Sequence, residues 1–190
     1  MSDPHFFGYG SLVNRATHAY PDLHRARLRG WRRAWAQTSL RSVAFLTIVP
    51  ADPQAEIDGL TARVPGSDWA ALDAREWAYD RITVTAEVTH PAPHPREIAV
   101  YSVPPRHRNA PGGDHPILLS YLDVVVQGYL REFGEPGAAR FFASTDGWQA
   151  PVLDDRAAPR YPRHQRLTEA ETALVDDLLG TCGATIITAA

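Results

Sequence analysis

The chain contains no lysine, and all 19 of its basic residues are arginine. Schiff-base chemistry, a lysine base and the phosphate-binding lysine of a Walker loop are therefore excluded. The single cysteine, Cys182, excludes an intrachain disulfide and has no evident catalytic setting. The longest apolar runs, such as residues 43–49, are far too short to span a membrane, and the N-terminus lacks the pattern of a signal peptide. We therefore expect a cytoplasmic protein with no membrane partner.

The composition is that of an ordinary globular protein. Of its 190 residues, 44% are hydrophobic and 22% are charged, which argues against disorder and suits one substantial core. We expect a single domain over residues 1–190. The net charge of −3 argues against general nucleic-acid binding.

Hydrophobic patterning predicts strands in the first half of the chain and helices in the second. The expected strands are residues 5–9, 27–38, 43–50, 57–64, 81–90 and 98–103. Residues 43–50 and 57–64 flank a turn-like segment, which favours a hairpin or meander. The expected helices are residues 69–76, 117–133 with Gly134 as a stop, 136–143, and a helix opened by the Thr168–Glu171 capping box that ends near 179. Strands followed by helices favour an α+β domain.

A glycine-rich turn near the N-terminus is the first candidate for a binding site. An extended apolar segment ends there in Phe7-Gly8-Tyr9-Gly10-Ser11-Leu12. Such a turn exposes backbone N–H groups that can hold a carboxylate or a developing oxyanion, and residues 13–19 could continue as a helix. For Tyr9 and Ser11, ordinary turn packing is the alternative. The turn is interpreted as an anion-binding site.

A second candidate is Glu76, where a short helix should give way to a strand. Its neighbours Trp69, Trp77 and Tyr79 could form a partly apolar pocket that raises the pKa of the carboxyl group and makes it a proton acceptor near neutral pH. The alternative is an ion pair with Arg75 or Arg81 on a solvated surface. Taken alone, the ion pair is the commoner arrangement.

Together, the turn and the later segment Leu72-Asp73-Ala74-Arg75-Glu76-Trp77-Ala78-Tyr79-Asp80-Arg81 resemble the γ-glutamylcyclotransferase-like superfamily. This superfamily includes γ-glutamyl, γ-glutamylamine and ChaC-type glutathione cyclotransferases. The resemblance extends roughly over residues 6–129. Leu12 is followed by Val13 and Asn14, where ChaC-type members usually have an Ile-Trp pair, so a glutathione-specific assignment is not favoured.

The resemblance implies a mixed, barrel-like β-sheet flanked by helices, no cofactor and a small-molecule γ-glutamyl substrate. The substrate's own α-amine would attack its γ-carbonyl, giving pyroglutamate (5-oxoproline) and a free amine. Glu76 matches the general acid/base of the family. Tyr9, Gly10, Ser11 and Leu12 match the loop that binds the glutamyl group, and Tyr121 falls where members often place a tyrosine near it.

Other interpretations of single residues remain open at this stage. Periodicity alone favours Tyr121 on an apolar helix face, and Arg81 could bind Glu76, a substrate carboxylate or nothing beyond its own strand end. The polar loop of residues 104–116 and the segment of residues 156–166, which includes Arg160 and Arg163, could shape the leaving-group side.

Other functions have weaker support. Ser11 lacks the G-x-S-x-G elbow of a hydrolase nucleophile, and His90 and His94 lie in a proline-rich segment without further metal ligands, so we expect no metal. The arginines and tryptophans of residues 24–35 could bind single-stranded nucleic acid, but solvated strand arginines explain them more simply. The main rival is a non-catalytic small-ligand-binding module on the same fold.

Overall fold

The computed structural model describes residues 3–91, 95, 97–110 and 112–188. Its strands are β1 (His5–Gly8), β2 (His24–Arg29), β3 (Trp31–Thr38), β4 (Arg41–Pro50), β5 (Glu56–Arg63), β6 (Asp80–Thr83), β7 (Val88–Thr89), β8 (Ile98–Ser102), β9 (Ile117–Leu118), β10 (Thr145–Asp146), β11 (Val152–Asp154) and β12 (Ile186–Thr188). The α-helices are α1 (Ala70–Arg75), α2 (Leu119–Ala143) and α3 (Glu169–Thr181). Short 3-10 turns are η1 (Ser11–Val13), η2 (Arg15–Thr17), η3 (Pro65–Ser67) and η4 (Pro105–His107).

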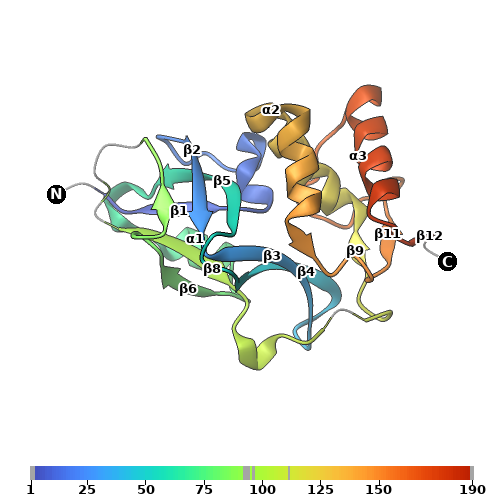
Figure 1. Ribbon diagram of the computed structural model, residues 1–190, viewed down its shortest axis with the longest axis horizontal. Helices are drawn as coiled ribbons and strands as arrows, with labels where there is room; N and C mark the ends of the chain where they lie inside the picture. The colour runs from blue at the N-terminus through green and yellow to red at the C-terminus, as the bar shows by residue number, and fades with distance from the viewer. Residues whose placement is uncertain (1–2, 92–94, 96, 111, 189–190) are drawn as a thin grey trace.

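The largest sheet has six strands in the order β6-β8-β1-β5-β2-β7. It is mixed, because β1 runs parallel to β8 and antiparallel to β5. The two edge strands β6 and β7 are consecutive in the chain, and the five residue steps from Thr83 to Val88 can span at most about 18 Å. A flat sheet would separate its edges by about 24 Å. The sheet must therefore curl, as Figure 1 shows.

Two smaller sheets continue the fold beside the curled one. Strand β3 lies between β10 and β4, and β11 lies between β12 and β9. Figure 1 shows β3 and β4 crossing from the six-stranded sheet toward α2 and α3, with the two chain ends at opposite ends of the molecule. The core includes the buried residues Phe7, Trp35, Leu60 and Tyr129. The predicted α+β class, with a barrel-like mixed sheet flanked by helices, is confirmed.

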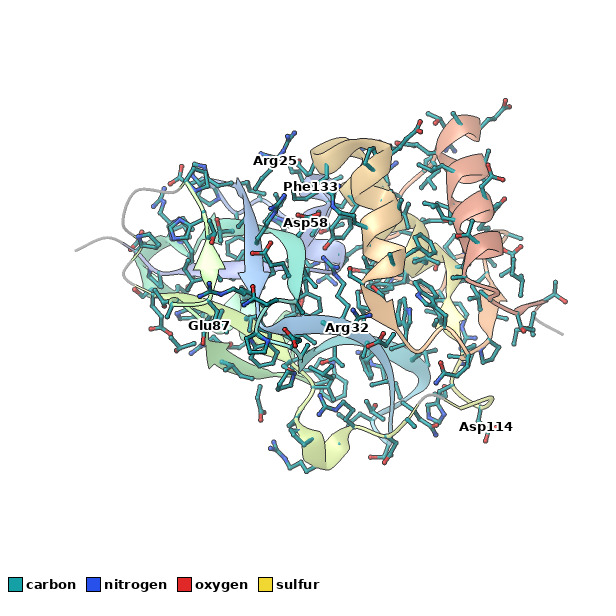
Figure 2. The ribbon with its side chains drawn as sticks, in the orientation of Figure 1. Arg25, Arg32, Asp58, Glu87, Asp114 and Phe133 are labelled. Atoms are coloured by element: carbon teal, nitrogen blue, oxygen red, sulfur yellow. The ribbon has the colours of Figure 1, made fainter. Side chains whose placement is uncertain are left out.

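Side chains close the junction between the six-stranded sheet and α2. In Figure 2, Asp58 from β5 and Phe133 from α2 lie on this side of the molecule, with Arg25 above them. These three residues line one surface groove together with Arg27 and Arg140. No helix in the described part of the chain is long and apolar enough to cross a membrane.

Three strand predictions are wrong in detail. Residues 27–38 are not one strand, because Gly30, with φ of 80°, separates β2 from β3 and sends them into different sheets. Residues 43–50 and 57–64 do not form a hairpin: β4 pairs with β3, while β5 pairs with β1 and β2. Residues 81–90 break at a turn closed by the Glu87 N–H on the Val84 carbonyl. Ile82, Val84 and Val88, on the two sides of this break, pack in the same core, whereas Ala86 lies in the turn and is exposed.

The helix predictions hold better. Gly134, with φ of 69°, interrupts α2 as expected, although helical backbone resumes at once and Ile117 and Leu118 belong to β9. The capping box of Thr168 and Glu171 opens α3 as predicted. Residues 13–19, in contrast, form no α-helix, because η1 and η2 are separate turns. The Asn14 side chain accepts the Ala16 N–H and so caps the start of η2.

Candidate active site

The glycine-rich turn follows β1, an inner strand of the six-stranded sheet. Its glycines are required by close packing: a Cβ on Gly8 would lie 2.6 Å from the Leu12 Cβ, and one on Gly10 would lie 2.6 Å from the Tyr121 hydroxyl. Both separations are shorter than real Cβ contacts. The turn therefore folds tightly over Leu12 and beneath Tyr121, from a helix more than a hundred residues away.

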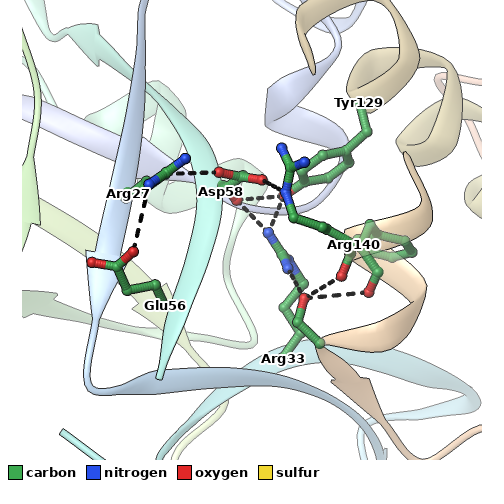
Figure 3. A network of polar contacts seen from close by, with 8 residues as sticks. Arg27, Arg33, Glu56, Asp58, Tyr129 and Arg140 are labelled. Atoms are coloured by element: carbon green, nitrogen blue, oxygen red, sulfur yellow. Dashed lines mark hydrogen bonds and ion pairs between the residues drawn. The ribbon is translucent and has the colours of Figure 1, made fainter. Parts of the chain in front are cut away.

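A buried arginine fixes the direction of this turn. Arg33 of β3 is 1% exposed and has no ion pair within the described chain. Its Nε donates to the Tyr9 carbonyl at 3.2 Å, and its Nη1 donates to the Ser144 hydroxyl at 2.7 Å. Its Nη2 donates to the Asp58 carbonyl and to the Tyr129 hydroxyl (Figure 3). Neutral oxygens and the Tyr129 ring, 4.9 Å away, thus compensate its burial.

The Tyr9 carbonyl accepts a second bond from the Tyr129 hydroxyl at 2.9 Å. Because the Tyr9–Gly10 peptide is trans, its N–H points opposite to its carbonyl. With the carbonyl held in the core, the Gly10 N–H faces the other way. No hydrogen bond among the described residues uses the N–H of Gly10 or Leu12. Both residues line a cavity, which we call the turn pocket; its lining consists of Phe7, Gly8, Tyr9, Gly10, Ser11, Leu12, Leu46, Glu76, Tyr79, Tyr101 and Tyr121.

Glu76 enters the turn pocket from the C-terminal end of α1. Its backbone N–H still bonds to the Leu72 carbonyl, so the last turn of α1 sets the position of its side chain, which is 17% exposed. Burial raises the pKa of the Glu76 carboxyl group, and the positive charges of Arg75 and Arg163 oppose that rise. The carboxyl group is therefore a proton acceptor of greater basicity than an exposed glutamate.

Arg75 connects Glu76 to the turn. Its Nε lies 3.2 Å from Glu76 Oε1, while its Nη2 donates to the Ser11 hydroxyl at 3.2 Å and its Nη1 to the Thr17 carbonyl at 3.0 Å. The ion pair expected as the alternative for Glu76 thus exists, but inside a pocket: the Arg75 side chain is only 8% exposed. One guanidinium holds both halves of the site together.

Tyrosines surround the carboxyl group. Burial raises the pKa of Tyr9, Tyr79 and Tyr121, and the nearby Glu76 charge adds to the rise in each case. All three hydroxyls are therefore neutral at physiological pH. Two are occupied by backbone: Tyr9 donates to the Tyr101 carbonyl at 2.7 Å and Tyr79 to the Leu46 carbonyl at 3.0 Å. Tyr121 is the one of the three whose hydroxyl lies against Gly10.

The structure brings all the predicted site residues into the turn pocket: Tyr9, Gly10, Ser11, Leu12, Glu76 and Tyr121. Tyr121 also packs edge-on against Trp35 and Tyr161, so it joins the core and the pocket at once. Their roles in binding and catalysis stay predictions.

The predicted aromatic surroundings of Glu76 need correction. Trp77 is 51% exposed and does not line the turn pocket, and Trp69 packs in a separate hydrophobic cluster against the Arg81 guanidinium. Arg81 pairs with Asp73 at 2.6 Å and not with Glu76. Trp77 lies beyond the last residue of α1, Arg75, and is exposed, whereas the Glu76 side chain is mostly buried and lines the turn pocket.

A second cavity adjoins the turn pocket and shares five lining residues with it: Ser11, Leu46, Glu76, Tyr79 and Tyr121. We call it the arginine pocket; its remaining lining is Arg41, Val43, Ala44, Phe45, Arg75, Trp77, Ala78, Leu118, Arg160, Tyr161, Pro162 and Arg163. The Tyr161 hydroxyl donates to Ser11 Oγ at 2.9 Å, which ties this loop to the turn.

Sequence reasoning missed the connecting roles of Arg75, Tyr161 and Arg33. The sequence context offered only weak indications of these roles. Arg75 is next to the proposed acid/base, Tyr161 lies in an arginine-rich loop, and Arg33 occupies an inward-facing strand position. Arg41 carried no signal, since it lies at a strand end. Of the two histidines weighed as metal ligands, His94 lies outside the described residues, which contain no group of three or more residues able to hold a metal.

The curled sheet and a buried carboxyl group beside a glycine-rich turn together define a protein class. Residues 6–123 match the family model of AIG2-like gamma-glutamyl cyclotransferases. The chain therefore belongs to the AIG2-like γ-glutamyl cyclotransferase family. No curated protein matches it.

Solved structures share the fold at low sequence identity. A gamma-glutamyl cyclotransferase matches with a TM-score of 0.57 and 15% identity, over 93% of this chain and 99% of the other. An uncharacterized protein from Homo sapiens matches with a TM-score of 0.58 and 14% identity, over 93% of this chain and 99% of the other. YkqA from Bacillus subtilis matches with 0.57 and 18% over 77% of this chain, which spans only 57% of YkqA.

Proposed function

We propose that this chain is a cofactor-independent γ-glutamylcyclotransferase. It would cyclise a γ-glutamyl amino acid, amine or peptide to 5-oxoproline and release the amine. The observation that carries the proposal is that Glu76 and the glycine-rich turn, two halves of a site separated in sequence, line one pocket. Membership of the family supports the same reaction class.

The proposed reaction needs proton transfers but no external nucleophile. Glu76 removes a proton from the substrate's α-ammonium group, and the amine attacks the γ-carbonyl carbon to close a five-membered ring. The amide C–N bond then breaks, and Glu76 returns the proton to the leaving nitrogen. An α-ammonium group has a pKa of about 8. Because burial raises the pKa of Glu76, the difference between the two pKa values is smaller than it would be for an exposed glutamate.

The turn supplies the electrostatic half of the proposal. The unused N–H groups of Gly10 and Leu12 are donors for the γ-carbonyl oxygen as it gains negative charge, or for the α-carboxylate. Arg33 and Tyr129 hold the Tyr9 carbonyl, so the Gly10 N–H needs no reorientation during the reaction. Tethering of the nucleophile within the substrate supplies much of the remaining rate advantage.

The test is incubation of the purified protein with a panel of γ-glutamyl amino acids, γ-glutamylamines and glutathione, with 5-oxoproline measured by mass spectrometry. The proposal expects 5-oxoproline from at least one panel member. If no member is turned over while a γ-glutamyl compound still binds, the non-catalytic binding module is the better description.

A further inference from the structure

Three arginines in the arginine pocket have no acidic partner. Arg41 lies on β4, and Arg160 and Arg163 lie on the loop before α3. All three are exposed, and none forms an ion pair with a described residue, whereas most other arginines of the described chain do. The guanidinium of Arg41 lies against two rings instead, 5.1 Å from that of Trp77 and 6.0 Å from that of Phe45.

The arginine pocket carries an excess of positive charge. Its lining contains four arginines and a single carboxyl group, that of Glu76, which is already paired with Arg75. The field of the unpaired arginines reaches the site, since Arg163 opposes the raised pKa of Glu76. Guanidinium groups without partners, gathered in a concave site, favour a ligand that brings carboxylates.

We propose that the arginine pocket selects substrates whose released part carries two or more carboxylates, such as an acidic amino acid or a short acidic peptide. The inference rests on the proposed function, because it assigns the turn pocket to the γ-glutamyl group and the adjoining arginine pocket to the leaving group. On ring closure the amide C–N bond breaks, the leaving nitrogen takes the proton from Glu76, and an acidic amine departs along Arg41, Arg160 and Arg163.

Two dipeptides of nearly equal size provide the test. γ-Glutamylglutamate and γ-glutamylglutamine differ by one carboxylate against one amide. We expect the wild-type protein to favour the first in kcat/KM by about tenfold, a factor equivalent to about 1.4 kcal/mol. Arg41→Gln, Arg160→Gln and Arg163→Gln should each lower this preference by about two- to fivefold, and the triple variant should abolish it.

The comparison is made as a ratio within each variant, so that any effect on Glu76 cancels. Arg166→Gln is the matched control, because Arg166 is an exposed arginine of the same loop that lies outside the arginine pocket. It should keep the wild-type preference. Equal rates for the two dipeptides in the wild-type protein, or an unchanged preference in the triple variant, would overturn the inference and leave the cyclotransferase proposal intact.

If neither dipeptide yields 5-oxoproline, although another γ-glutamyl compound does, the inference fails. If no compound does, the proposed function fails, and calorimetric binding of the two dipeptides decides the inference. Tighter binding of γ-glutamylglutamate, lost in the triple variant, supports an anion-selecting pocket; equal binding or no binding rejects it.

Discussion

Two arginine clusters on this molecule differ in what satisfies them. In the surface groove beside α2, Arg27 and Arg140 both contact the buried carboxylate of Asp58, at 3.3 and 2.8 Å (Figure 3). In the arginine pocket, Arg41, Arg160 and Arg163 contact no carboxylate of the described chain. The charges of the first arginine cluster are thus balanced by a carboxylate of the protein itself. Those of the second cluster are left to pair with a ligand, as proposed above.

The carboxyl groups of the two regions differ in the same way. Asp58 is 8% exposed and is held by two guanidinium groups, a geometry that stabilises the junction of sheet and helix. Within the described part of the chain Glu76 forms an ion pair with Arg75, and burial raises the pKa of Glu76. A carboxyl group kept basic at the expense of folding stability is typical of functional sites.

The largest expected effect is a loss of rate on substitution of Glu76, which distinguishes this carboxyl group from that of Asp58. Glu76→Gln should lower the rate of 5-oxoproline formation by at least about 10²-fold, because the amide cannot accept a proton. Its thermal stability should not fall. The raised pKa of Glu76 means that the ionised form costs stability as pH rises through that pKa, and glutamine removes this cost at neutral pH.

The matched variant is Asp58→Asn. It should retain the rate but lower the free energy of unfolding by about 1–2 kcal/mol, since two partly exposed arginines lose their charged partner. Thermal melts and initial rates measured side by side decide the matter. Activity in Glu76→Gln comparable to that in Asp58→Asn would show that the roles are misassigned.

A second variant tests whether the two regions are independent. Tyr129 bonds to the Asp58 carbonyl at 2.7 Å and to the Tyr9 carbonyl at 2.9 Å, so it joins the structural network to the turn. Tyr129→Phe should lower kcat by about tenfold with a smaller change in KM, and lower stability by about 1 kcal/mol, because one bond on the Tyr9 carbonyl is lost.

Steady-state kinetics and denaturant unfolding of Tyr129→Phe supply these values. Loss of stability with an unchanged kcat would mean that Tyr129 supports the fold alone.

The third expected effect is a shift along the pH axis. The positive charge of Arg75 opposes the rise in the pKa of Glu76, so Arg75→Gln should raise this pKa further. Because the base form of Glu76 is needed, the acid limb of the kcat/KM profile should move to higher pH. A pH–rate profile of both proteins measures the shift, and movement toward lower pH would contradict the assignment of Glu76 as the base.

The smallest expected effects compare one arginine from each cluster. Arg163→Gln should leave stability unchanged and move the acid limb slightly upward, since Arg163 opposes the pKa rise of Glu76 less than Arg75 does. Arg27→Gln should leave the profile unchanged and lower stability by less than about 1 kcal/mol. The contrast is lost if both variants shift the profile equally, an outcome that parallel titrations would reveal.

Sequence patterns predicted the elements of this fold better than their pairing. Alternation identified most strands, yet Gly30 divided residues 27–38 between two sheets. Which strands pair depends on contacts distant in sequence, such as β1 with β8, and these leave no local signal. The capping box at Thr168 succeeded because its hydrogen bonds lie within three residues.

The candidate site shows the same division. The turn and Glu76 were accessible because both belong to short motifs. Arg33, Tyr129 and Tyr161 act through bonds to Tyr9 and Ser11 that only the folded chain creates. Of the aromatic residues expected around Glu76, Tyr79 lines the turn pocket, but Trp69 lies at the opposite end of α1 and Trp77 is exposed beyond its C-terminal end.

The most direct test of the cyclotransferase proposal follows the oxygen atoms of the product. A γ-glutamyl substrate turned over in water enriched in oxygen-18 should yield unlabelled 5-oxoproline in amounts equal to the released amine, because the nucleophile is the substrate's own nitrogen. Labelled glutamate would reveal hydrolysis by water instead and would contradict the proposal, as would the absence of any product across the whole substrate panel.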